Sequence, residues 1–262
     1  MKRDLIFLTG LPRAGHTLLG SILQQNKEIT STSQLVTSTI FDTLINFKLS
    51  EIFVSYPDHN SMNNVIHNFF DMYFEKWKQK HIIQRATLTP DIIGRLHEYF
   101  PTKNIKFIAL ERDPLEVLAS IIKFCKKEQS AWLNAYRELE NDYLKCKFLM
   151  NEKGFIRTEE MTLKYLKEKE SKNTLFIDYY NLTKNPKKEI DRLYNFLNIK
   201  KFKHDFKNLK EFKNNNIPYN SYVLGKGFYK TYPTVKPAKK YAKKVLDKSI
   251  FQAYNKKDRK NV

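Results

Sequence analysis

Cysteine is scarce in this sequence, and long apolar runs are missing. The 262 residues include only two cysteines, Cys125 and Cys146, which cannot build a disulfide framework and have no neighbouring ligands at zinc spacing. The first apolar run, from Leu5 to Leu8, ends at a Thr-Gly pair, so it is too short for a signal peptide or a membrane span, and no other run is longer. We therefore expect a cytoplasmic protein in a reducing compartment, with no transmembrane segment.

Acidic residues are also few, since 28 Asp and Glu face 47 Lys and Arg, which leaves a formal net charge of +19. Such a charge attracts polyanions, among them nucleic acids, anionic membranes, acidic glycans and nucleotide cofactors. The abundance of Lys, Asn, Ile and Phe is also what an AT-rich genome produces. The charge alone therefore does not identify the ligand.

Apolar and β-branched runs alternate with helical periodicity along the chain. Strands are predicted at 4–9, 81–86, 105–110 and 174–179, and helices at 16–25, 34–47, 61–79, 90–100, 113–124, 130–151, 158–170, 186–197 and 238–254. This alternation indicates a three-layer α/β fold with a mostly parallel central sheet and helices on both faces. We expect one domain over 1–262, with a helical insertion at about 34–79 and a basic C-terminal loop and helix at about 199–262.

The strongest local motif is Gly10-Leu-Pro-Arg-Ala-Gly-His-Thr17, which lies where the first strand ends and a helix begins. Backbone N–H groups in such a loop, together with the helix N-terminus, form an anion site. The glycine spacing is that of a nucleoside-triphosphate P-loop, but His16 stands where that motif has its lysine. The motif alone leaves open an ordinary strand-to-helix turn, a P-loop kinase or hydrolase, and another anion-binding enzyme.

Residues Pro12 to Thr17 resemble the 5′-phosphosulfate loop of the sulfotransferase family, with departures at Ala14 and His16. The resemblance implies a P-loop sulfotransferase fold and 3′-phosphoadenosine 5′-phosphosulfate as the sulfuryl donor. It implies that Arg13 provides the cation beside the bridging oxygen, and that the 5′-phosphate is held by the loop at Ala14, Gly15, His16, Thr17 and Leu18. A permanently charged, forked guanidinium suits that position chemically.

A second match is Arg112-Asp-Pro-Leu-Glu-Val-Leu-Ala-Ser120, at the end of the third predicted strand. In the family, an arginine and a serine eight residues later hold the 3′-phosphate, so the resemblance assigns Arg112 and Ser120 to it. An arginine at a strand end and a serine in the second turn of the next helix can converge on one phosphate. Taken singly, Arg112 could be a surface ion-pair residue, and Ser120 could bond its own helix.

Two weaker matches follow. The segment from Phe176 to Pro186, with the helix that follows it, resembles a strand and helix of the family. In the family a tyrosine at the end of that strand packs near the adenine, so the resemblance assigns Tyr179 to the donor. Gly225-Lys226-Gly227 resembles the loop that closes over the 3′-phosphate, which makes Lys226 a predicted electrostatic contact. A core tyrosine and a solvated loop are the alternative interpretations.

The general base of the family has no clear counterpart. The positions where its branches carry histidine or glutamate fall near Thr87 and Gln34, neither of which accepts a proton usefully at neutral pH. We hypothesise that His16 contacts the donor sulfate or the acceptor as a base, a cation or a neutral donor, which makes Arg13 and His16 the predicted catalytic residues. Asp42 and Glu28 are further candidate bases; His59, His67, His81, His97 and His204 receive no role.

The predicted function is transfer of a sulfuryl group from this donor to a hydroxyl or amine of a small-molecule, glycan or peptide acceptor, without a metal and without specific nucleic-acid binding. The rival enzyme is a P-loop nucleotide kinase or hydrolase, although Asp113 is better explained as a helix cap than as a magnesium ligand. A catalytically inactive nucleotide-binding relative also fits, because the base is missing. A nucleic-acid module is the last alternative, suggested by the net charge and by Lys239, Lys240, Lys243 and Lys244. Neither the acceptor nor the oligomeric state follows from the sequence.

Overall fold

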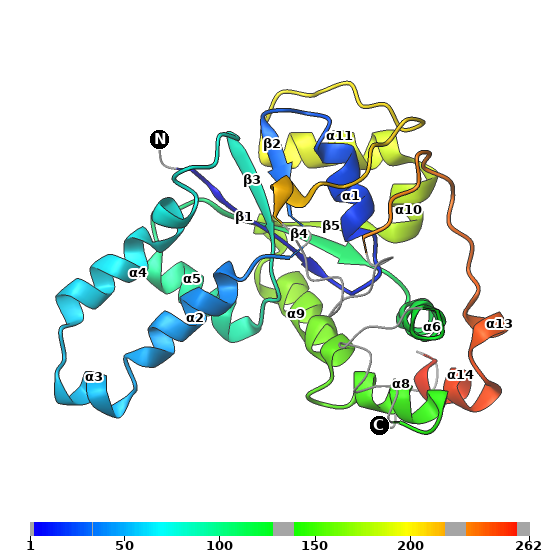
Figure 1. Ribbon diagram of the computed structural model, residues 1–262, viewed down its shortest axis with the longest axis horizontal. Helices are drawn as coiled ribbons and strands as arrows, with labels where there is room; N and C mark the ends of the chain where they lie inside the picture. The colour runs from blue at the N-terminus through cyan, green and yellow to red at the C-terminus, as the bar shows by residue number, and fades with distance from the viewer. Residues whose placement is uncertain (1–2, 33, 128–138, 218–228, 256–262) are drawn as a thin grey trace.

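A five-stranded sheet forms the centre of the molecule (Figure 1). The structure is a computed structural model that describes residues 3–32, 34–127, 139–217 and 229–255. The strands are β1 (Leu5–Gly10), β2 (Ile29–Ser31), β3 (His81–Arg85), β4 (Ile105–Glu111) and β5 (Thr174–Asp178). They lie in the order β2-β3-β1-β4-β5, and every ladder is parallel. The predicted α/β class with a parallel sheet is thereby confirmed.

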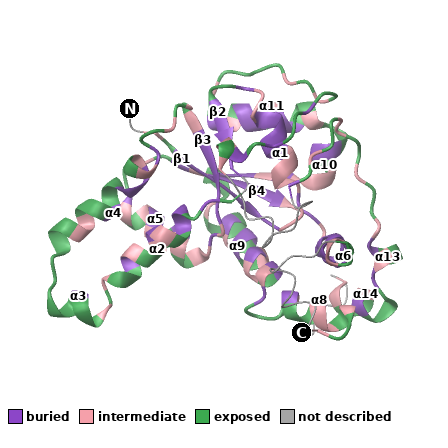
Figure 2. Cartoon of the chain, in the orientation of Figure 1, coloured by how far each residue is buried: buried purple, intermediate pink, exposed green. Residues whose placement is uncertain are grey.

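The central strands of the sheet are almost entirely buried, as Figure 2 shows. All six residues of β1 are buried, and Phe7 stacks on Phe107 of β4 with ring centroids 6.0 Å apart. Full burial of a large apolar side chain stabilises the fold by about 1.5–3 kcal/mol. The carboxyl end of β1, where the anion loop begins, is therefore held by the most firmly packed strand of the sheet.

Helices cover both faces of the sheet, as predicted (Figure 1). Helices α1 (His16–Leu23) and α11 (Pro186–Leu197) lie over one face, and α6 (Pro114–Cys125) and α9 (Phe155–Lys169) lie over the other. Asp113 caps α6, since its Oδ1 accepts the Leu115 N–H at 3.0 Å, which confirms the predicted helix start. The body also contains α5 (Pro90–Tyr99), α8 (Asp142–Met150) and α10 (Tyr179–Lys184), and the short turns η1 (Ser171–Asn173) and η2 (Asn214–Asn216).

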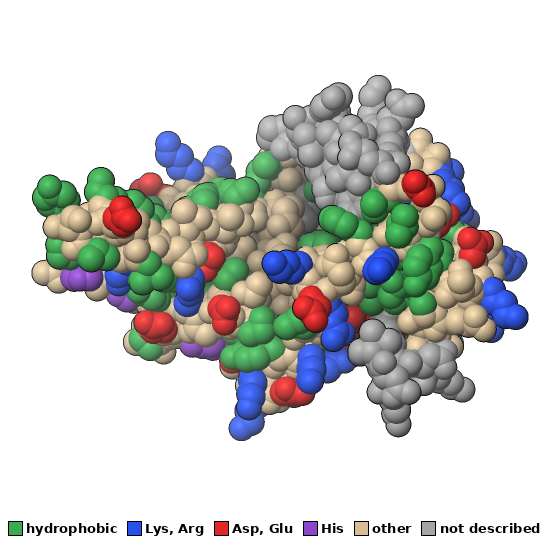
Figure 3. All heavy atoms as spheres, turned by 90° about the horizontal axis from the view of Figure 1, so that it is seen from below, with side chains coloured by type: hydrophobic (Ala, Val, Ile, Leu, Met, Phe, Trp, Pro, Cys, Tyr) green, Lys and Arg blue, Asp and Glu red, His purple; other side chains and the backbone are tan. Residues whose placement is uncertain are grey.

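A helical arm projects from the body between β2 and β3 (Figure 1). It consists of α2 (Thr37–Phe47), α3 (Glu51–Ser55) and α4 (His59–Tyr73), so its helices lie within the predicted insertion. Its outer end carries exposed apolar side chains (Figure 3), of which Leu49 and Tyr56 are 77% and 80% exposed. Within the described part of the chain, no helix has the length and apolarity needed to cross a bilayer.

Several predicted boundaries are wrong. Strand β2 was not predicted, because three residues are too few to show a period. The predicted helix at 238–254 consists of α13 (Ala242–Val245) and α14 (Lys248–Tyr254), which are separated by extended backbone at Leu246. Residues 130–138 of the helix predicted at 130–151 lie outside the described residues. Its remainder forms α8 (Asp142–Met150), where the Asn141 side chain accepts the Leu144 N–H at 2.9 Å.

Candidate functional site

The loop between β1 and α1 has the backbone of an anion cradle. Gly10, Arg13 and Gly15 all adopt positive φ angles, at 110°, 60° and 101°. At Gly10 a Cβ atom would lie 2.2 Å from the Leu110 carbonyl oxygen, so only glycine fits there. Arg13 carries a side chain, for which the left-handed conformation is energetically costly, and such residues are frequent at functional sites.

The first turn of α1 adds unpaired backbone N–H groups next to this loop. Gly15 is its N-cap and has no side chain to satisfy the turn. Among the described residues no protein acceptor faces the backbone N–H groups of His16, Thr17 and Leu18. Unpaired amides at a helix N-terminus favour a negatively charged ligand, because the helix dipole adds to their partial charge.

Arg13 joins the loop to the second predicted phosphate site. Its Nε donates to Ser120 Oγ at 3.3 Å, and its carbonyl accepts from Arg112 Nη1 at 2.7 Å. Arg13, Arg112 and Ser120, which lie up to 107 residues apart in the sequence, therefore meet at the carboxyl ends of β1 and β4. The pKa of Arg13 is lowered by burial and by the charge of Arg112, but an arginine remains charged at neutral pH.

Aromatic rings surround the Arg112 guanidinium. Its Cζ lies 4.5 Å from the Tyr179 ring centroid and 5.8 Å from that of Tyr241. Tyr179 opens α10 rather than ending β5, because Asp178 caps that helix. Its ring also lies against the loop, since a Cβ at Gly15 would come within 3.0 Å of Tyr179 Cδ2. The predicted adenine residue is thus in contact with both predicted phosphate sites.

The remaining predicted donor residues are placed as follows. Ala14 is buried and its N–H donates to Leu11 O at 3.3 Å. The carbonyl of Thr17 accepts from Ser21 Oγ at 2.8 Å, which fixes the first turn of α1. Leu18 packs against the hydrophobic core, so only its backbone faces a ligand. Lys226 lies outside the described residues.

His16 is partly buried and turned toward the end of β1. Its Nε2 lies 3.3 Å from the Thr9 carbonyl oxygen. Since a carbonyl only accepts, Nε2 carries the hydrogen and Nδ1 the lone pair. Desolvation, and next the positive charge of Arg85, hold the pKa of His16 well below its usual range. Of the three roles hypothesised for His16, the geometry therefore favours a neutral ring over a cation.

A buried ion pair that sequence reasoning missed lies beside His16. Arg85 at the end of β3 donates through Nη2 to Glu159 Oε1 of α9 at 2.9 Å, and the two side chains are only 4% and 0% exposed. Glu159 Oε2 also accepts from Thr9 Oγ1 and from Gly10 N–H, both at 3.3 Å. Glutamate at position 159 follows no local motif, so only the fold shows the contact.

Gln34 and Thr87, the two positions to which the resemblance assigned the missing base, meet in space. Gln34 Nε2 donates to Thr87 Oγ1 at 3.5 Å, just beyond the carboxyl ends of β2 and β3. Glu28, by contrast, precedes β2 and lies at the opposite edge of the sheet. Asp42 forms an ion pair with Arg95 in the arm. The geometry therefore gives neither carboxylate access to the anion loop.

The C-terminal segment, residues 229–255, is held against α6 by a buried carboxylate. Glu116 of α6, which is 3% exposed, accepts the Tyr241 N–H at 2.9 and 3.0 Å and the Ala242 N–H at 2.9 Å. This contact holds the Tyr241 ring near Arg112. Sequence reasoning missed both residues, since a glutamate in the first turn of a helix usually only complements the helix dipole.

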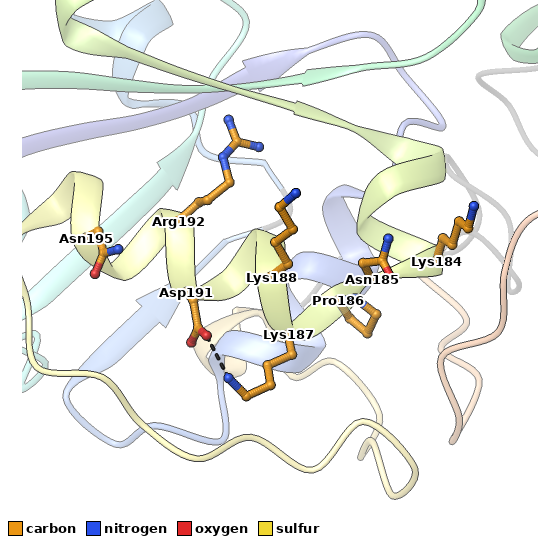
Figure 4. Close-up of a pocket in the computed structure, with 8 residues that line it drawn as sticks. All are labelled: Lys184, Asn185, Pro186, Lys187, Lys188, Asp191, Arg192 and Asn195. Carbon is orange, nitrogen blue, oxygen red and sulfur yellow. Dashed lines mark hydrogen bonds and ion pairs between the residues drawn. The ribbon is translucent and has the colours of Figure 1, made fainter.

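A hollow of about 710 Å³ lies elsewhere, on the outer surface of α10 and α11 (Figure 4). Lys187 and Asp191 pair within it at 2.8 Å. None of the predicted site residues lines it; the lining consists of Lys184, Asn185, Pro186, Lys187, Lys188, Asp191, Arg192 and Asn195. It therefore plays no part in the site described above.

Comparisons with known proteins bear on the fold and on the family of this chain. No curated protein matches the chain by sequence. Among solved structures, the sulfotransferase domain from the curacin biosynthetic pathway has a TM-score of 0.50 and 18% identity over 97% of this chain and 91% of that one. A sulfotransferase from Alicyclobacillus acidocaldarius has a TM-score of 0.50 and 13% identity over 78% and 85% of the two chains. The sulfotransferase domain of the Synechococcus PCC 7002 olefin synthase has 0.50 and 16% over 77% and 76%.

These likenesses show the fold, and the sequence family is shown separately. The model of the sulfotransferase family matches residues 4–204, from the start of β1 to beyond α11. That span contains the anion loop, Arg112, Ser120 and Tyr179. This chain belongs to the sulfotransferase family.

Proposed function

We propose that this protein transfers a sulfuryl group from 3′-phosphoadenosine 5′-phosphosulfate to a hydroxyl or amine of an acceptor. The observation that carries the proposal is the meeting of two anion sites through one residue: Arg13 belongs to the loop and also contacts Ser120 and Arg112. A donor with phosphate on both its 5′ and 3′ oxygens matches two such sites. A nucleoside triphosphate has its phosphates in one chain and leaves the second site unused.

The residues present fit this donor. Arg112 is 7% exposed, and within the described part of the chain neither its buried Nε nor the hydroxyl of the neighbouring Tyr180 has a hydrogen-bond partner of good geometry. A buried guanidinium N–H without an acceptor is unfavourable, and a phosphate oxygen is the acceptor that suits it best. Together with the unpaired amides of His16, Thr17 and Leu18, this makes the site short of negative charge at two places.

In this proposal the chain's own groups take the following roles. The α1 amides hold the 5′-phosphate, Arg112 and Ser120 the 3′-phosphate, and Arg13 neutralises charge on the oxygen that departs. When bound, the donor supplies a sulfuryl group that passes in line to the acceptor. Tyr179 orients the nucleotide by its ring face.

The acceptor enters from the side of the arm in this proposal. Gln34 and Thr87 lie where the arm joins the body and beyond the strand ends, the usual position for substrate contacts in parallel sheets. A neutral His16 with a free lone pair on Nδ1 is the group we assign to receive the acceptor proton. Small-molecule, glycan and peptide acceptors all remain within the proposal, as does the cytoplasmic location predicted from the sequence.

The rival nucleotide kinase is less well supported. The P-loop lysine that contacts the transferred phosphate is replaced by a histidine with a depressed pKa. The two acidic residues at the end of β4 are engaged elsewhere: Glu111 pairs with Lys167 at 2.5 Å, and Asp113 caps α6. Neither is placed to hold magnesium.

Ligand binding separates these functions. We predict that 3′-phosphoadenosine 5′-phosphate raises the melting temperature more than ATP with magnesium at equal concentration, because a ligand stabilises the native state according to its concentration over its dissociation constant.

We further predict that Arg112→Ala weakens the binding of 3′-phosphoadenosine 5′-phosphate about 10–100-fold, because one charge-assisted phosphate contact is lost. Calorimetry measures the affinity of the wild type and of the variant for this nucleotide.

Two controls make the result specific. Adenosine 5′-phosphosulfate lacks the 3′-phosphate, so Arg112→Ala should weaken it much less than 3′-phosphoadenosine 5′-phosphate, through the lost contact with the Arg13 carbonyl alone. Arg95→Ala removes an arginine that pairs with Asp42 in the arm and should leave both affinities unchanged. A preference for ATP, or an equal loss for both nucleotides in Arg112→Ala, would contradict the proposal. Transfer of radiolabelled sulfate to an acceptor panel then distinguishes an enzyme from an inactive nucleotide-binding relative.

A further inference from the structure

The Arg85–Glu159 pair contacts both sides of the first residue of the anion loop. Glu159 Oε2 accepts the Gly10 N–H at 3.3 Å, while Arg85 Nη2 donates to the Gly10 carbonyl at 3.2 Å. Glu159 also accepts from Thr9 Oγ1 at 3.3 Å, and Arg85 Nη1 donates to the carbonyls of Leu8, at 3.5 Å, and Ala86. One ion pair therefore grips the backbone where β1 turns into the loop.

Stability alone does not explain why Arg85 and Glu159 are buried as an ion pair. Removing two charges from water carries a desolvation penalty that their attraction often does not repay, and replacement by apolar residues is frequently neutral or stabilising. The pair does fix the geometry of the backbone that it contacts, since charged groups with several fixed partners tolerate one arrangement only. Each of its bonds ends on the segment from Leu8 to Gly10 or on the end of β3.

Thr9 connects the pair to His16. The Thr9 hydroxyl is bonded to Glu159, and the Thr9 carbonyl is the atom that faces His16 Nε2 at 3.3 Å. The charged group that bears on His16 is Arg85 from β3, which is itself paired with Glu159 from α9. The imidazole is thus oriented by a backbone segment that the ion pair holds.

We propose that Arg85 and Glu159 are positioning residues, which fix the Thr9–Gly10 backbone and thereby the amides of the anion loop and the ring of His16. They touch no part of the donor in this proposal and act through the loop. The inference rests on the proposed function only for the choice of ligand. The effects on the Gly10 backbone and on the His16 ring are measurable without any ligand.

The decisive variant replaces both charges. Arg85→Met with Glu159→Met keeps side-chain length and leaves no unpaired buried charge, so this double variant should fold. We expect its dissociation constant for 3′-phosphoadenosine 5′-phosphate to rise at least tenfold in calorimetry. We also expect the pKa of His16, followed by NMR without ligand, to rise toward its usual range, because the positive charge of Arg85 is gone.

The matched control is Thr162→Val. Thr162 lies one turn along α9 from Glu159, is fully buried, and donates to Leu88 O at 2.6 Å. Its loss removes a buried hydrogen bond between the same helix and the same end of β3, without touching the loop. We expect a lower melting temperature but an unchanged affinity per folded molecule and an unchanged His16 titration.

A purely structural role would give a different pattern. If the folded double variant binds the ligand within twofold of wild type and His16 titrates as before, the inference is overturned. Should the double variant not fold, Glu159→Gln replaces it, and hydrogen exchange of the Gly10 amide is measured. Faster exchange than in Thr162→Val supports the inference, and equal exchange overturns it. If wild type itself fails to bind the nucleotide, the proposed function fails, while the His16 and Gly10 measurements still decide this inference.

Discussion

His16 shows how far a single residue departs from its motif. In the sequence it is a departure from two loop patterns, and its role was open between base, cation and neutral donor. In the fold its Nε2–H faces the Thr9 carbonyl, and desolvation and Arg85 lower its pKa. A neutral imidazole is what this environment stabilises.

A pH dependence of stability follows. The folded pKa of His16 lies below the unfolded value of about 6.5, so its contribution is complete above that pH and is lost as the pH falls from there toward the folded pKa. Denaturant unfolding should show the free energy of unfolding decreasing with acidification by up to about 1.4 kcal/mol per pH unit for this group. His81 and His204 also have lowered pKa values and add to the slope with the same sign.

His16→Gln isolates the contribution of one residue. The slope below pH ~6.5 should be shallower by one proton in the variant, and the two curves should run parallel at higher pH, where these histidines are neutral in both states. Equal slopes in wild type and variant would show that His16 is not held neutral.

The residues of the site divide by the kind of signal that they leave. Arg13, Arg112 and Ser120 were predicted from loop identity and from a spacing of eight, because each belongs to a contiguous motif. Glu159 bonds Thr9 across 150 positions, and its neighbours in α9 carry only the helical period. No local pattern encodes such a contact, so it emerges only when β3, β1 and α9 are packed together.

At the scale of elements, α6 connects the candidate site to the C-terminal segment. It begins beside Arg112 and carries Ser120, and on the same helix Glu116 binds the N–H groups of Tyr241 and Ala242. Removal of this carboxylate leaves two amides without their charged acceptor, each worth about 1–3 kcal/mol when buried. The segment that carries Tyr241 should then detach.

Limited trypsin digestion tests this connection. In Glu116→Ala, cleavage between 236 and 244, where lysines are frequent, should be several-fold faster than in wild type, because the site becomes locally unfolded. Glu189→Ala is the matched control, since Glu189 is a buried glutamate of α11 whose described partner is Arg192. Equal cleavage in the two variants would contradict the role given to Glu116.

The elements themselves were largely predictable. Long periodic stretches such as β1, β4, α6 and α11 appear within a few residues of their expected bounds, since burial on a fixed face imposes a period on the sequence. The three residues of β2 impose none, and its pairing with β3 is long-range. The lysine-rich stretch before α14 has the composition of a helix. It forms only α13, whose first N–H groups at Tyr241 and Ala242 bind Glu116, and extended backbone at Leu246 separates it from α14.

The whole molecule carries a net charge of +19, and this affects how fast an anionic ligand arrives. Attraction between a cationic protein and a nucleotide phosphate acts over a Debye length, which falls from about 30 Å at 0.01 M salt to about 8 Å at 0.15 M. We predict that the association rate of 3′-phosphoadenosine 5′-phosphate, measured by stopped flow, falls at least several-fold across that range, with a smaller change in the dissociation rate. Adenosine, which has no charge, should show no such dependence, and a similar dependence for both ligands would rule out steering.

The arm has a consequence for how such a protein diversifies. Helices α2, α3 and α4 leave from the carboxyl end of β2 and return to β3, two strands whose register is fixed by their own ladder. We therefore expect that changes of sequence or length in the arm leave β1 and the loop after it in place. Under the proposed function, the acceptor can then be exchanged while the donor is kept.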